Sequence, residues 1–123
     1  MKIDLLNPVS AKLLGAVAGF RGEFKGAYNI RQDSGCAGRR STDNIRILPH
    51  REGKPGIEIH VAPGTPGETV YIPATVTHGN VEDLTYNDFY VGEGAKVTII
   101  AGCGVHTDDG GEAKHNGVHR FFI

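Results

Sequence analysis

The sequence predicts a mainly β protein preceded by a short amino-terminal α-helix, and three observations support this fold class. Six short segments after residue 41 are rich in β-branched and aromatic residues and are bounded by glycine, proline, asparagine or aspartate. Apolar residues recur at helical spacing only near the start of the chain. Ile45, Ile57, Thr69 and Val81 lie twelve residues apart, which indicates strands at a nearly constant interval.

The helix is expected to begin at Asn7 and Pro8. Asparagine caps the first turn of a helix, and the fixed φ angle of proline suits the first helical position. An apolar stripe at helical spacing follows, formed by Leu13, Leu14, Val17 and Phe20. The sequence therefore predicts one short amphipathic helix and no second one.

Residues 22–40 are dominated by glycine and charged residues around a short strand expected at Ala27–Arg31. We therefore divide the chain into a helix and loop-rich link, residues 1–40, and a β core, residues 41–123. Six strands are expected in this core, at Ile45–Leu48, Ile57–Val61, Thr69–Ile72, Leu84–Val91, Ala95–Ala101 and Val118–Ile123. The twelve-residue spacing suits stacked coils, but a β-sandwich of short strands would share it, so the residues alone leave both architectures open.

Composition excludes several classes of partner. A net charge of −1 gives no basic surface for nucleic acid or for an acidic membrane. The apolar run Leu13–Ala18 is too short to span a bilayer, and Asp4, Pro8 and Lys12 interrupt the apolar region that a signal peptide requires. Two cysteines provide no disulfide framework. We therefore expect reduced thiols and a cytoplasmic location.

One cysteine and three histidines gather near the end of the chain. Cys103, His106, His115 and His119 follow the pattern Cys-x2-His-x8-His-x3-His, which matches no standard zinc module. Thiolate and imidazole are the ligands that iron and zinc prefer, so these four residues are candidate metal ligands. Even spacing on a strand places His115 and His119 on one face, which permits chelation.

The two cysteines are expected in different environments. Val97, Ile99 and Ala101 share one strand face, and Cys103 continues that face if the strand runs on, so its thiol is expected to point inward. It is then either a small buried apolar residue or a functional thiol. Cys36 lies in a glycine- and arginine-rich stretch and is expected to be exposed.

The remaining polar motifs predict surface positions. His50, His60 and His78 have no neighbours of ligand type and are expected at the surface. Asp108–Glu112 is an acidic, glycine-rich turn that is expected to be solvated and to hold a cation only weakly. No Ser-His-Asp arrangement or paired-carboxylate site is recognisable, so the sequence gives no support for catalysis.

Four segments, in order along the chain, carry a family resemblance. Gly26–Arg31, Ser41–Ile45, Pro63–Val70 and Tyr86–Ala95 resemble the shorter members of the SufB/SufD family of iron–sulfur cluster assembly proteins. Members of that family continue well beyond the position of Ile123. The resemblance therefore implies that the chain is an amino-terminal portion whose core is interrupted at its carboxyl end.

The resemblance implies a fold and a function. It implies a right-handed parallel β-helix portion, and a scaffold that is not an enzyme but works with a SufC-type ATPase and a second SufB/SufD-like subunit or a second copy. Gly102–Cys103 resembles a glycine-cysteine pair at the mouth of an internal tunnel in the family, which implies a contact of Cys103 with a transient, shared iron–sulfur cluster. Larger members continue with Thr-Ala-Pro, whereas this chain has Gly104–His106.

Two other classes of function stay open from the residues. The first is a small β-rich metal-binding module that uses Cys103, His106, His115 and His119. The second is a structural fragment with no activity of its own. Metal content after anaerobic purification, with and without sulfide, discriminates between a metal module and a scaffold.

Overall fold

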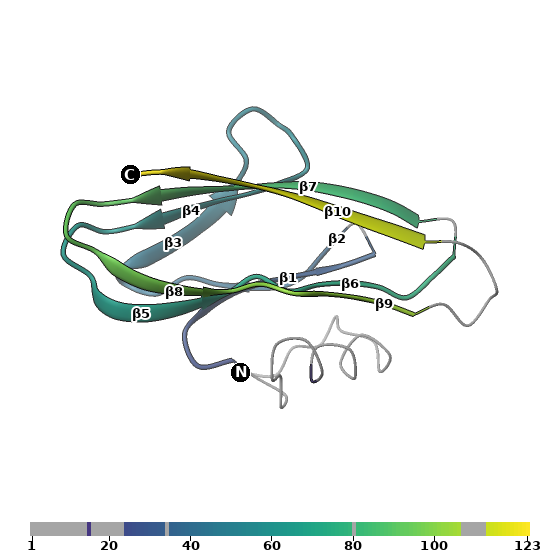
Figure 1. Ribbon diagram of the computed structural model, residues 1–123, viewed down its shortest axis with the longest axis horizontal. Coiled ribbons are helices and arrows are strands. Elements are labelled where there is room, and N and C mark those ends of the chain that lie inside the picture. Colours follow the sequence, from purple (N-terminus) through teal and green to yellow (C-terminus); the bar gives the residue numbers. More distant parts are fainter. Residues whose placement is uncertain (1–14, 16–23, 34, 80, 107–112) are drawn as a thin grey trace.

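The computed structural model describes residue 15 and residues 24–33, 35–79, 81–106 and 113–123, and their fold is mainly β. Figure 1 shows these residues as two layers of strands that lie one over the other. The predicted amino-terminal helix, apart from Gly15, and the acidic turn Asp108–Glu112 lie outside the described residues.

The described residues form two sheets. The six-stranded sheet comprises β1 (Ala27–Gln32), β2 (Gly35–Arg40), β5 (Pro66–Tyr71), β6 (Ala74–Val76), β8 (Lys96–Ile100) and β9 (Cys103–Val105). The four-stranded sheet comprises β3 (Ile45–Pro49), β4 (Gly56–Val61), β7 (Val81–Val91) and β10 (Ala113–Phe122). β3 pairs in antiparallel with its sequence neighbour β4, and after β4 the chain alternates between two strands of the six-stranded sheet and one strand of the four-stranded sheet.

From β4 onward the chain passes from one sheet to the other and back, and each pass stacks in parallel on the one before it. Gly56 in β4 pairs with Tyr86 in β7, and Ala74 in β6 pairs with Cys103 in β9, so one circuit takes about thirty residues. The predicted twelve-residue interval is therefore not the structural repeat. Ile57 pairs with Asn87, because one circuit crosses both sheets before it returns to the same layer.

Residues 24–40 are part of this stack and do not form a link. β1 pairs in parallel with both β5 and β6, and in antiparallel with β2. The side chain of Arg40 supports this start of the stack by donating hydrogen bonds to the carbonyl oxygens of Phe24 and Gly26. The division at residue 40 therefore does not coincide with a break in the structure.

The apolar core lies between the two sheets. Ile57, Ile59 and Val61 of β4 point inward and are buried, as the two-residue period of a strand requires. Phe89 of β7 lies beside Ile59 in register and is fully buried. At the start of β4, Gly56 has a φ of 136°, and a Cβ atom there would collide with the backbone of Tyr86, so the close approach of β4 to β7 requires glycine.

Candidate functional site

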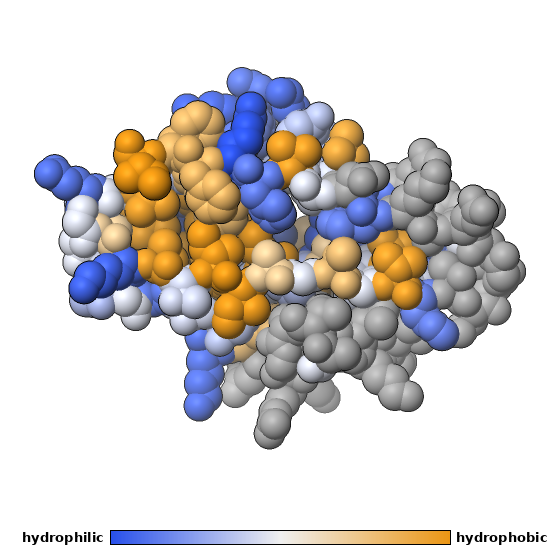
Figure 2. Space-filling model, in the orientation of Figure 1, coloured by the Kyte–Doolittle hydropathy of each residue, from blue (hydrophilic) through white to orange (hydrophobic). Residues whose placement is uncertain are grey.

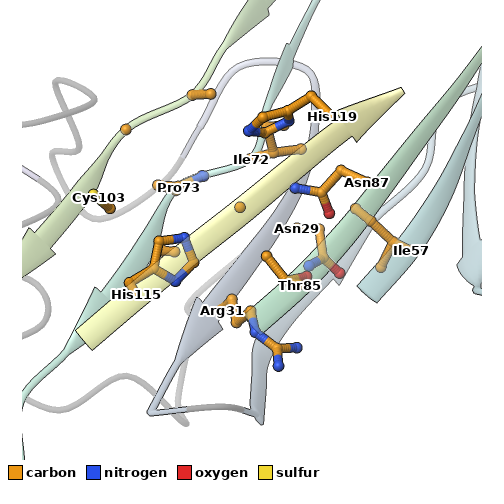
Figure 3. Close-up of a pocket in the computed structure, with 14 residues that line it drawn as sticks. Asn29, Arg31, Ile57, Ile72, Pro73, Thr85, Asn87, Cys103, His115 and His119 are labelled. Carbon is orange, nitrogen blue, oxygen red and sulfur yellow. The ribbon is translucent and has the colours of Figure 1, made fainter. Parts of the chain in front are cut away.

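A cavity of about 350 Å³ lies between the two sheets, beyond the apolar core. Both sheets line it, and its polar and thiol lining includes Asn29, Arg31 and Cys103 from one sheet and Asn87, His115 and His119 from the other. Figure 3 shows the two histidines projecting from the same strand, β10. The cavity therefore gathers three of the four residues that the sequence predicts as metal ligands.

The pairing of β7 with β10 explains why this end of the interior is polar. Asp83, Thr85 and Asn87 alternate along the inward face of β7 and are buried. On β10 they are in register with His115, Gly117 and His119, respectively. The next inward pair is Phe89 with Phe121, so the interior changes from polar to apolar along these two strands.

Cys103 is the first residue of β9 and lines the cavity, so it faces the interior as predicted. Its thiol is nevertheless exposed, and the expectation of a buried small apolar residue is wrong. The reason is that β9 lies at the edge of its sheet, and no further strand covers it among the described residues. The exposed position makes the thiol accessible to a reaction partner.

His106 does not join the cavity. It follows β9, its backbone N–H donates to the carbonyl oxygen of Val76 at 2.9 Å, and its side chain is exposed. Within the described part of the chain, no three or more His, Cys, Asp or Glu side chains are grouped so that they could hold a metal ion. The structure therefore does not assemble the four predicted ligands as one site.

His115 is held by a buried carboxylate. Its Nδ1 lies 2.8 Å from Oδ2 of Asp83, whose side chain has no exposed surface. Arg31 reaches the same carboxylate, with its Nη2 2.7 Å from Oδ1. Because a carboxylate only accepts hydrogen bonds, Nδ1 of His115 must carry the proton, and Nε2 of the neutral ring carries the lone pair.

Asp83 is charged despite its burial. Burial by itself raises the pKa of Asp83, but the hydrogen bonds from Arg31 and His115 outweigh burial and hold this pKa below its usual value. The carboxylate therefore balances the charge of Arg31 inside the protein. Neither Asp83 nor its second partner Arg31 was predicted as part of this site, because Asp83 lies 32 positions from His115 and 52 from Arg31.

His119 lies two inward positions beyond His115, with Gly117 between them. A Cβ atom at Gly117 would lie 3.2 Å from Nε2 of His119 and 3.6 Å from Nε2 of His115. Both imidazole rings therefore lie close to Gly117, which has no side chain to displace them. Partial burial of the ring, with a smaller contribution from His115, lowers the pKa of His119.

A second polar cluster lies on the outward face of the four-stranded sheet and corrects the surface prediction for His50. Its side chain is 1% exposed, and its Nε2 lies 2.8 Å from Oδ2 of Asp88, which also binds Arg120 of β10. The residues between β3 and β4 fold over this face, which explains the burial. His60 is half-buried against Glu58, whereas His78 is exposed as predicted.

Glu58 in this cluster gives the fold a pH dependence. Hydrogen bonds from Arg51, opposed by burial and aided by His60, lower the pKa of Glu58 to about 2. A folded-state pKa below the unfolded value stabilises the protein above the unfolded pKa of 4.5, and this contribution disappears as the pH falls from 4.5 towards 2. Because the Arg51 side chain is 57% exposed, we expect the loss to be only about 1–2 kcal/mol.

Urea unfolding at pH 6 and pH 3 measures this contribution. Glu58→Gln is expected to reduce the pH dependence of the free energy of unfolding, whereas Glu52→Gln, at an exposed carboxylate, should retain it. Equal pH dependence in the parent and Glu58→Gln would contradict the assigned role of Glu58.

Comparison of the chain with family models, with curated proteins and with solved structures finds no match. In the described residues, no helix has both the length and the apolar character needed to cross a membrane.

Proposed function

We propose that this chain is a scaffold component of SUF-type iron–sulfur cluster assembly that works with a SufC-type ATPase and is not itself an enzyme. The observation that carries the proposal is the cavity into which Cys103 faces from one sheet while His115 and His119 face from the other. The four segments that resemble the SufB/SufD family support it. Strands about thirty residues apart pair in parallel, and this supports a right-handed parallel β-helix as the architecture of the scaffold.

The side chains of the cavity suit this chemistry. An accessible thiolate accepts sulfur or binds iron, and imidazole is also a good ligand for iron. A conventional four-iron cluster uses four protein ligands, and the chain has two cysteines. The cluster is therefore transient and shared with other chains, with Cys103 as the contact from this one.

The free edge of β10 is the proposed surface for a second SufB/SufD-like subunit or a second copy. Among the described residues, β10 pairs only with β7, and its end exposes Phe121, Phe122 and Ile123. Figure 2 shows apolar surface at the end of the molecule where β10 finishes. An edge strand with apolar side chains favours pairing with another strand. We place the complex in the cytoplasm, where thiols stay reduced.

Cluster delivery measured with single cysteine variants tests the proposal. The chain is purified anaerobically with a SufC-type ATPase, supplied with iron and a sulfur donor, and assayed for activation of an apo-ferredoxin. Cys103→Ala is expected to reduce delivery to the level seen without the chain. Cys36→Ala removes the other exposed thiol and is the matched control, which should stay close to the parent.

Two results would overturn the proposal. The first is no binding of the ATPase by the parent chain together with no cluster delivery. The second is equal delivery by the Cys103→Ala and Cys36→Ala variants, which would remove the role of Cys103. Unchanged unfolding midpoints in both variants are required before delivery is compared.

A further inference from the structure

Two imidazole side chains of β10, those of His115 and His119, lie next to the same cavity-lining residue, Gly117. The Nε2 atoms of His115 and His119 lie 3.6 Å and 3.2 Å from the position of a Cβ atom on Gly117. These two distances limit the separation of the nitrogens to about 7 Å. A metal ion at about 2.0–2.1 Å from each nitrogen needs them no more than about 4 Å apart, a change that rotation of the exposed His119 side chain can supply.

His115 already has the environment of a metal ligand. Metal-binding histidines usually donate their second ring N–H to a carboxylate, which fixes the tautomer and raises the basicity of the free nitrogen. Asp83 accepts this hydrogen bond from Nδ1 at 2.8 Å, and Arg31 fixes the carboxylate from the opposite sheet. Nε2 of His115 therefore keeps its lone pair and can bind a ligand in the cavity.

We infer that His115 and His119 bind an exchangeable first-row divalent cation through their Nε2 atoms, with Gly117 leaving room for the ion and Asp83 orienting His115. Two protein ligands are fewer than a structural zinc site uses. Water or an incoming sulfur ligand completes the coordination, so the ion can be released. The identity of the ion as ferrous iron rests on the proposed scaffold function, whereas the site itself does not.

Cobalt titration of the full chain tests the site without ATPase, sulfide or cluster. Anaerobic Co²⁺ binding, followed by visible absorption, is expected to saturate at one ion per chain. His115→Gln and His119→Gln should each weaken binding by about tenfold or more, because each removes one of two ligands. Gly117→Ala keeps both ligands but fills the point between them, and it should weaken binding similarly.

His106→Gln is the matched control, because His106 belongs to the same sequence motif but lies outside the cavity lining. It should bind Co²⁺ like the parent, and circular dichroism should show that all four variants remain folded. No saturable binding by the parent below about 1 mM, or equal losses in His106→Gln and His119→Gln, would overturn the site. Because this titration requires no partner, failure of cluster delivery leaves its outcome unaffected, and the two proposals fail separately.

Discussion

Asp83→Ala is expected to lower the free energy of unfolding by about 3–5 kcal/mol. The Asp83 side chain has no exposed surface and binds both Arg31 and His115. Its removal leaves the guanidinium of Arg31, which is only 16% exposed, without its buried counter-charge. Urea unfolding followed by circular dichroism measures the loss.

Two comparisons isolate the buried pair as the cause. Asp43→Ala removes an exposed carboxylate and should change the free energy of unfolding by no more than about 0.5 kcal/mol. The double variant Asp83→Leu with Arg31→Met removes both charges and should be more stable than Asp83→Ala, because no unpaired charge stays buried. A loss in Asp83→Ala no larger than that in Asp43→Ala would contradict the buried ion pair.

The strands β3 and β4 could be predicted from the sequence because their own residues favour strands. Ile45–Leu48 and Ile57–Val61 lie within one residue of β3 and β4 at each end. β2 could not be predicted in this way, since Gly35–Arg40 consists of glycine, alanine, cysteine and arginine. Its pairing with β1, together with the hydrogen bond of Arg39 to Asn29 at 2.7 Å, stabilises a strand that its composition disfavours.

The repeat of about thirty residues cannot be recognised in the sequence, for a physical reason. One circuit of the chain contains a strand of the four-stranded sheet, two strands of the other sheet and the turns between them, so residues that pair are about thirty positions apart. Ile57 pairs with Asn87, and Asn87 pairs in turn with His119. An apolar, an amide and an imidazole side chain share this stacked position, so hydropathy alone shows no repeat there.

For the candidate site, the sequence could predict only how side chains are oriented within a single strand. Two-residue alternation correctly placed Cys103 towards the interior and His115 with His119 on one face. It could not show that His106 lies outside the cavity or that Cys103 is exposed at a sheet edge. It also could not reveal Asp83, which becomes a partner of His115 only when β7 and β10 are in register.

The prediction for His50 failed because burial of a loop residue depends on what the loop covers. The residues after β3 fold back over the four-stranded sheet, where the His50 side chain meets Asp88 and Arg120. No neighbour of His50 in the sequence signals this contact, since Asp88 lies 38 positions away and Arg120 lies 70 positions away.

Phe89→Ala is expected to lower the free energy of unfolding by about 3–5 kcal/mol, through lost burial and the cavity that remains. Phe89 is fully buried, lies in register with Ile59, and stacks on Phe121 with ring centroids 4.8 Å apart. It therefore joins three stacked strands of the four-stranded sheet at the boundary between the apolar core and the polar cavity. Urea unfolding provides the measurement.

Leu84→Ala is the matched control because Leu84 lies on the same strand, β7, but is 43% exposed. It should cost well under half as much as Phe89→Ala, since less apolar surface returns to water. Hydrogen exchange adds a second readout. Amides of β10 should exchange faster in Phe89→Ala, because Phe121 loses its stacking partner and β10 pairs with no other strand among the described residues. Equal unfolding energies and equal exchange in the two variants would mean that the inward face of β7 is not the core of this fold.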